Sequence, residues 1–330
     1  MDFWQEIPFV RLAYTYRCQE DLQLPPYKGS AWRGALGHAL KKVTCALRRA
    51  SCAECLLRQT CVYVYVFETP PPPDSQRLRL YPAAPHPFVL RPPLDQRQRF
   101  APGDELSGEL LLIGRAMEYL PYFVYTLEVL GQEGLGRGRG RAALLEVKEL
   151  DHRQQPVAEI YASTTGLLSA PSQAAWRQTR AAAAPAPRRP LDLSLEFLTP
   201  VRLKYQGRFL ERLEFHHLIR NLLRRLASLA YFHCGLDPEA FPFKETIRTA
   251  EQVASTASQL QWLDWERYSS RQQSRMLMGG LVGRMHCRQV PPQFLSLLRT
   301  GEHLHVGKMA SFGLGQYGVE IETTFSGGRK

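Results

Sequence analysis

The chain has 330 residues, of which 44% are hydrophobic and 22% charged, enough for a folded protein of two domains. No run approaches the ~18 apolar residues of a membrane span, and the first residues lack the layout of a signal peptide, so we expect a cytoplasmic protein without a membrane partner. The net charge of +11, from 42 Lys and Arg against 31 Asp and Glu, predicts a polyanionic partner such as a nucleic acid.

The N-terminal half predicts the element order βαββαβ. Alternating and helical apolar spacings give, in chain order, a strand at Ile7–Tyr16, a helix capped by Ser30 with Leu36, Leu40, Val43 and Leu47 on one face, strands at Val62–Phe67 and Glu109–Ile113, a helix at Ala116–Leu130 and a strand at Ala142–Leu150. We therefore expect one α+β domain over residues 1–150, with a cysteine-rich insert at about 45–61.

The C-terminal half repeats this order over residues 191–330. Its predicted elements are a strand at Leu193–Lys204, a helix at about Leu210–His233, strands at Trp262–Trp265 and Arg275–Cys287, a helix from Pro291 through Leu298 capped by Gly301, and a last strand from Val319. The Ala- and Pro-rich run before it makes residues 151–190 a predicted linker.

Each half has a glycine-rich segment before its last strand, Gly134–Arg141 and Gly307–Gly318. Glycines let the backbone approach a ligand and turn its N–H groups outward, which suits phosphate, although a tight turn is the ordinary alternative. The matching positions favour phosphate. We take Lys308, Ser311, Gly313 and Gly315 as RNA contacts.

Several segments carry a resemblance to a known family. They are Gly29–Gly37, Thr199-Pro200, residues 264–272, Gly279–Gly283 and Leu304–Lys308 running into Phe312–Gly315. With two tandem ferredoxin-like (RRM-like) units, they resemble the repeat-associated mysterious protein (RAMP) superfamily, and within it the CRISPR precursor-RNA processing endoribonucleases.

The resemblance implies a metal-independent endoribonuclease that cuts CRISPR repeat RNA into guide RNAs by attack of the 2′-hydroxyl. The products would be a 2′,3′-cyclic phosphate and a 5′-hydroxyl, and other subunits of a CRISPR effector complex would be further partners. The alternative is a RAMP subunit that binds guide RNA without cutting it. A basic zinc-containing scaffold without RNA is a third reading, in which both glycine loops are turns.

Cleavage of this kind requires an acid, a base and a cation near neutral pH. His38, Lys41 and Lys42 have the spacing i, i+3, i+4 and so lie on one helix face, opposite the apolar stripe. They are the first catalytic candidates, with Tyr27 and Lys28 just before the helix as assistants, although a basic helix face is often simply solvated.

His305 is the second catalytic candidate. With His303 it would point toward the glycine loop if Glu302–His305 were extended, but a histidine that only shapes that loop explains the pattern equally well.

Basic side chains supply the predicted RNA contacts. Arginines between glycines have little use in a core and suit bidentate phosphate contacts, whereas the stripe His217, Arg220, Asn221 and Arg224 of the long C-terminal helix could also be a solvated face. The candidates are Arg33, Arg137, Arg139, Arg141, Arg220 and Arg224.

Four of the seven cysteines gather in the insert, namely Cys45, Cys52, Cys55 and Cys61. A Cys-x2-Cys knuckle with two more thiols predicts a tetrahedral structural zinc without an open position for a catalytic water. An iron–sulfur cluster and four free thiols are the alternatives, and the resemblance implies no cofactor for catalysis.

Overall fold

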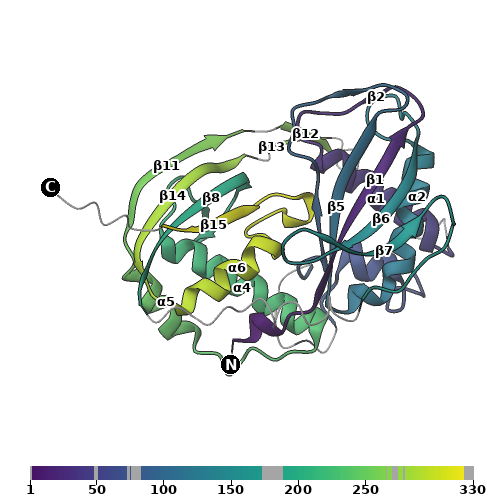
Figure 1. Ribbon diagram of the computed structural model, residues 1–330. Helices are drawn as coiled ribbons and strands as arrows, with labels where there is room; N and C mark the ends of the chain where they lie inside the picture. The colour runs from purple at the N-terminus through teal and green to yellow at the C-terminus, as the bar shows by residue number, and fades with distance from the viewer. Residues whose placement is uncertain are drawn as a thin grey trace.

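The computed structural model describes residues 2–47, 51–72, 75, 83–172, 189–264, 266–269, 274–277 and 279–322. Each half of the chain contributes one main antiparallel sheet with helices packed on it (Figure 1). The predicted mixed α and β content is therefore confirmed, and the paired strands are antiparallel.

The N-terminal sheet has five strands in the order β3-β5-β1-β6-β7. Its elements are η1 (Phe3–Glu6), β1 (Phe9–Cys18), β2 (Leu22–Gln23), α1 (Gly29–Thr44), the π-helical turn η2 (Val64–Glu68), β3 (Phe88–Arg91), β4 (Arg99–Phe100), β5 (Glu105–Ile113), η3 (Gly114–Tyr119), α2 (Leu120–Glu133), β6 (Ala142–Leu150) and β7 (Pro156–Ala162). The short strands β2 and β4 pair with each other apart from the sheet.

The C-terminal sheet has the order β11-β14-β8-β15. Its elements are β8 (Leu191–Val201), β9 (Lys204–Tyr205), β10 (Arg208–Phe209), α4 (Phe215–Cys234), α5 (Phe243–Glu251), β11 (Ser255–Leu263), β12 (Glu266–Ser269), β13 (Ser274–Leu277), β14 (Gly280–Val290), α6 (Gln293–Leu304), η5 (Ala310–Phe312) and β15 (Tyr317–Ile321). The pairs β9–β10 and β12–β13 form separate hairpins.

Helix α1 shows why the sequence folds as it does. Its alanines and leucines favour a helix, and Trp32, Leu36 and Leu40 are buried toward α2 and the sheet. Lys41 and Lys42 lie in its last turn, where positive charge complements the helix dipole. The opposite face of α1, which includes His38 and Lys42, is exposed to solvent.

The two halves share a buried contact. The larger apolar cluster combines Val89, Leu111 and Ile113 of the N-terminal sheet with Leu193 and other residues of the C-terminal half. The 3₁₀ turn η1 packs on α4 and α6, and the turn η5 packs on β3 and α1. The glycine-rich loop around η5 therefore lies between the halves.

The predicted strand at Val62–Phe67 is wrong. The segment is helical, and Tyr63 stacks on Phe67 one turn later with ring centroids 5.5 Å apart. Its valines and aromatics favour strands in general, but burial of Val64 and Val66 is achieved here in a helical turn. The sheet position is filled instead by β3, which the sequence did not predict because all four of its residues are buried without alternation.

Two further predictions need correction. Gly301 does not cap the helix after Pro292, since α6 continues to Leu304 and Gly301 is packed inside it against Tyr317 and Leu222. The predicted linker 151–190 contains β7, and Ser172 donates two hydrogen bonds to the buried carboxylate of Glu149. Residues 156–162 therefore belong to the N-terminal sheet, and 173–188 lie outside the described residues.

Candidate functional site

The predicted group on α1 lies on the surface. His38 and Lys42 are exposed and Lys41 is half-buried, with its Nζ 5.6 Å from the ring centroid of Tyr63. Lys42 forms an ion pair with Glu133, the last residue of α2. The end of α1 and the end of α2 therefore meet at charged side chains.

The electrostatics of Glu133 connect this group to the arginine loop. The hydrogen bond from Lys42 is the main cause that lowers the pKa of Glu133, and electrostatic interactions with His38 and Arg139 lower it further. Thus His38 and Arg139, predicted separately as catalytic and RNA-binding residues, act on one carboxylate. We call His38, Lys41, Lys42, Glu133 and Arg139 the α1–α2 site.

The loop Gly134–Arg141 is held in place by its glycines. Gly134, Gly136 and Gly138 have positive φ angles, and a Cβ at Gly136 would collide with the carbonyl oxygen of Gln23. Arg141 is engaged by Glu20, with Nη2 and Oε1 2.7 Å apart. Arg137 and Arg139 are exposed, and within the described part of the chain their side chains form no ion pair, so they stay available to a phosphate.

The second glycine loop differs from the prediction. Its amides are used within the protein: Gly313 N–H donates to Ala310 O, Gly315 N–H to Pro200 O and Lys308 N–H to Arg202 O, at 2.9 to 3.0 Å. A Cβ at Gly313 would come too close to the backbone of Leu90. These glycines therefore allow close packing between the halves, and the expected outward N–H groups are not observed at these three residues.

Three side chains predicted near the RNA also join the halves. Arg33 donates to Ser311 Oγ at 3.2 Å, and its guanidinium lies 4.5 Å from the ring centroid of Phe312 and 4.8 Å from that of Phe67. Tyr27 O–H donates to Phe312 O at 2.6 Å, and burial raises the pKa of Tyr27. Arg33, Ser311 and Tyr27 thus form contacts between the halves, and their roles toward RNA stay predictions.

Lys28, the other predicted assistant, is fully buried. Its Nζ donates to the carbonyl oxygen and to Oδ1 of Asp95, at 2.7 and 3.0 Å. An ammonium held in this way has no access to a substrate.

His305 is buried directly after α6, so Glu302–His305 is not the extended segment considered in the sequence analysis. Arg91 Nε donates to His305 Nε2 at 3.0 Å, and the Nδ1 of His305 lies 3.2 Å from Leu314 O. Burial and the nearby Arg91 hold its pKa well below the usual range. Both ring nitrogens are engaged across the interface, so His305 shapes the glycine loop and does not face a substrate.

The basic stripe on α4 is only partly exposed. His217 and Asn221 are buried, and Arg220 forms an ion pair with Glu251. Arg224 is exposed and donates to Asn221 Oδ1 at 2.8 Å. Of the predicted stripe, Arg224 is thus the cation that remains most accessible.

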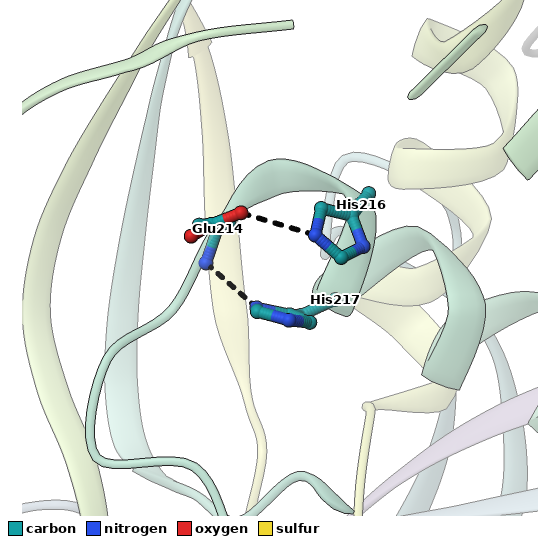
Figure 2. Close-up of side chains that lie close together, drawn as sticks. All are labelled: Glu214, His216 and His217. Carbon is teal, nitrogen blue, oxygen red and sulfur yellow. Dashed lines mark hydrogen bonds and ion pairs between the residues drawn. The ribbon is translucent and has the colours of Figure 1, made fainter. Parts of the chain in front are cut away.

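Glu214, His216 and His217 form a cluster that the sequence analysis did not single out (Figure 2). Glu214 N–H donates to His217 Nδ1 at 3.2 Å, which closes the capping box of α4, and Glu214 Oε2 lies 3.0 Å from His216 Nε2. Arg220 Nε donates to His216 Nδ1 at 3.3 Å. Because the two imidazoles are engaged in this way beside a guanidinium, the cluster serves to cap the helix.

The four cysteines of the insert form no disulfide. Across the described residues, which include all four, no three of these sulfur atoms come within 4.8 Å of one another. The structure therefore does not present a preformed tetrahedral site, and zinc stays a prediction. Among the described residues, no helix is both long and apolar enough to cross a membrane.

Two family models match the chain. Residues 7–173, half of the chain, match AF_1859_N, described as an N-terminal domain, and residues 195–317 match the CRISPR-associated endoribonuclease Cas6. The chain belongs to the RAMP superfamily of CRISPR-associated processing endoribonucleases. The Cas6 match runs from within β8 through the glycine loop.

The chain is also similar to individual proteins, by sequence and by structure. An uncharacterised protein of Archaeoglobus fulgidus is 24% identical over 90% of this chain and 92% of its own length. Among solved structures, a partial Cas6-RT-Cas1–Cas2 complex has a TM-score of 0.56 at 15% identity, covering 96% of this chain and 47% of the other, so this chain spans about half of that one.

Two further solved structures share the fold. A Cas6 product complex has a TM-score of 0.55 at 15% identity, covering 95% and 99% of the two chains. Thermus thermophilus Cas6 has a TM-score of 0.50 at 14% identity, with the same coverage. At these identities the likeness concerns the RAMP fold.

Proposed function

We propose that this RAMP protein is a metal-independent endoribonuclease that cleaves CRISPR repeat RNA at the α1–α2 site. The observation that carries the proposal is that Lys42, His38 and Arg139 all interact with the carboxylate of Glu133, whereas His305 is enclosed between the halves. The Cas6 match over residues 195–317 supports the substrate class.

The chemistry can be assigned to these side chains. A base takes the proton of a 2′-hydroxyl, the 2′-oxygen bonds to phosphorus, and the bond to the 5′-oxygen breaks as that oxygen takes a proton. His38 is the acid or base, because it is the exposed imidazole of the group. Lys41 and Lys42 stabilise the phosphorane charge, with Lys42 exchanging Glu133 for the phosphate.

Arg137 and Arg139 are the proposed contacts to the RNA backbone at this site. Both are exposed on a loop whose glycines fix its path. Guanidinium groups bind phosphate in a bidentate manner and so would position the strand over α1.

We also assign two tandem ferredoxin-like domains, at 1–150 and 191–330 with β7 added to the first. The support is the strand order: β3-β5-β1-β6 and β11-β14-β8-β15 are the same order when each half is numbered from its own first strand. Two such units offer the sheets and loops on which RNA-binding proteins of this superfamily are built.

A RAMP subunit that binds guide RNA without cutting it remains the second candidate. The ion pair between Lys42 and Glu133 favours this second candidate, because a paired lysine is less free to act on a scissile phosphate. The two candidates differ in one observable, the presence of a cut.

The test is incubation of the purified protein with labelled repeat RNA in EDTA, followed by analysis of the product ends. The nuclease predicts one cut in each repeat, with a 2′,3′-cyclic phosphate and a 5′-hydroxyl. Tight binding without a cut would select the non-catalytic subunit. Cleavage that stops in EDTA would contradict the metal-independent mechanism.

A further inference from the structure

Lys41 is held by an aromatic ring and not by a carboxylate. Its Nζ lies over the ring of Tyr63, 5.6 Å from the ring centroid. Within the described residues Lys41 forms no ion pair, whereas Lys42 beside it is paired with Glu133. An aromatic ring attracts an ammonium through its quadrupole and does not cancel the positive charge. Lys41 is therefore the lysine of the α1–α2 site that is positioned without being neutralised.

The ring of Tyr63 is itself held by other aromatic rings. It is parallel to the ring of Phe67 in the helical turn η2, with an interplanar angle of 2° and centroids 5.5 Å apart. Phe67 in turn packs on Phe88 of β3, with centroids 5.1 Å apart. Tyr63 is thus the outer member of a row of three rings that begins in the N-terminal sheet.

This row of rings lies along one face of α1. Arg33, Gly37 and Lys41 are spaced i, i+4 and i+8, so they share one side of the helix. The guanidinium of Arg33 lies 4.8 Å from the ring centroid of Phe67, and a Cβ at Gly37 would lie only 2.7 Å from Phe67 Cε1. The glycine therefore lets Phe67 approach α1 closely, and this approach brings the neighbouring ring of Tyr63 to Lys41.

We infer that Tyr63 is a positioning residue for RNA cleavage, which holds the Lys41 ammonium ready for the charge that develops on the scissile phosphate. The inference rests on the proposed function, in which Lys41 stabilises the phosphorane beside His38. The spacing i, i+3 puts His38 and Lys41 on the same side of α1. A cation held in place before the reaction stabilises a transition state without the cost of reorganisation.

The experiment measures single-turnover cleavage of repeat RNA at saturating protein, together with the Kd of the same RNA. Tyr63→Leu is expected to lower the cleavage rate about fivefold, the size of one well-placed cation–π contact. The Kd is expected to stay within about twofold, because the charge of Lys41 is retained and only its position in the transition state is lost. Tyr125→Leu removes a tyrosine of α2 that is 55% exposed, and this matched control is expected to change neither quantity.

Two further variants separate the attraction between ring and ammonium from packing. Tyr63→Phe keeps the ring and is expected to retain the cleavage rate. A ring-fluorinated phenylalanine in place of Tyr63 keeps the shape but withdraws the electron density that attracts a cation, and it is expected to be about as slow as Tyr63→Leu. This variant tests the contact even where Tyr63→Leu does not fold.

A double-mutant cycle shows whether Tyr63 acts through Lys41. In a Lys41→Gln background, Tyr63→Leu is expected to cause no further loss of rate, because the ammonium that the ring holds is already absent. An equal loss with and without Lys41, or full activity of the fluorinated variant, would overturn the positioning role.

The failure of this inference can be told apart from failure of the proposed function. Cleavage by the unmutated protein with independent effects of Tyr63 and Lys41 removes the positioning role and leaves the nuclease. Absence of cleavage by the unmutated protein removes both.

Discussion

Gly315 is required by the fold for a reason that the glycine-rich sequence alone does not show. Its φ is +70°, and a Cβ there would collide with the carbonyl oxygen of Val306. The glycine is required because two backbone segments meet, and this demand is independent of any phosphate.

Gly315→Ala is therefore expected to lower the free energy of unfolding by about 3 kcal/mol, the upper part of the range for single substitutions. Gly166 is the matched control, with φ of +66° and open space around it. Gly166→Ala is expected to cost about 1 kcal/mol, from backbone strain alone. Urea denaturation measures both, and equal losses would show that the contact with Val306 does not matter.

Glu133 is the residue of the α1–α2 site that the sequence analysis missed. Its position could have indicated it, because Glu133 ends a helix and directly precedes the arginine loop that begins at Gly134. Identifying its partner Lys42 required the packing of α1 on α2, which no local pattern gives.

Glu133→Gln should free Lys42 for the RNA. Removing a negative charge beside Lys42, His38 and Arg139 is expected to tighten RNA binding about threefold at low salt. Gln132→Glu, next to it on the exposed end of α2, places a charge there and is expected to act in the opposite direction. Weaker binding by Glu133→Gln would mean that the ion pair positions Lys42 for the RNA.

At the scale of elements, helices and strands were predicted best where the apolar pattern and the residue propensities agreed. The strand Ala142–Leu150 was predicted with its observed bounds, and α4 was predicted from its leucines. The helical turn at Val64–Glu68 was missed because its residues favour strands, and the hairpin β9–β10 was missed because the apolar pattern was taken as one strand up to Lys204. The turn Gln206-Gly207, with both φ angles positive, was the available signal.

The cysteine insert is the element whose role is still a prediction. If it binds zinc, the thiols must move together from where the structure places them. We expect about one zinc per chain by elemental analysis, lost in Cys52→Ser with Cys55→Ser but retained in Cys18→Ser, a buried cysteine outside the insert. A metal-free protein would leave four free thiols, and iron in its place would indicate a cluster.

At the scale of the whole molecule, two buried and neutral histidines, His233 and His305, form hydrogen bonds between the halves, and His86 is a third neutral histidine. Burial is the main cause that lowers the pKa of His86 to about 3 and of His233 to about 4, and the pKa of His305 also lies well below its usual value. Across the interface, His233 Nε2 lies 2.7 Å from Pro85 O, and His233 Nδ1 lies 3.1 Å from the Tyr65 hydroxyl oxygen.

Stability should therefore depend on pH in a defined direction. An unfolded histidine takes up a proton near pH 6.5, which the folded forms resist, so the contribution of these histidines to the free energy of unfolding is constant above about pH 7. Below pH 6.5 it falls, by up to about 1.4 kcal/mol per pH unit for each histidine. Urea denaturation between pH 7.5 and 5 measures this.

The matched pair is His233→Gln and His152→Gln. The first removes a buried histidine and should flatten the pH dependence, and the second removes an exposed one and should leave it unchanged. A free energy of unfolding that stays level down to pH 5 would argue against neutral interface histidines.

The sequence predicted the RAMP family and the candidate His38, but it could not choose between His38 and His305. That choice depends on burial, which follows from how the halves pack around Arg91 and the glycine loop. Sequence spacing predicts on which face of its own element a residue lies. Whether that face is buried depends on which other part of the chain packs against it.

The measurement that tests the central claim most directly is single-turnover cleavage of repeat RNA by His38→Ala beside His152→Ala. We predict that loss of His38 lowers the rate by roughly 10²- to 10⁴-fold with RNA binding retained, as expected for an acid or base, and that loss of His152 has no effect. Cleavage by His38→Ala at the rate of the unmutated protein would contradict the assignment of the active site to α1.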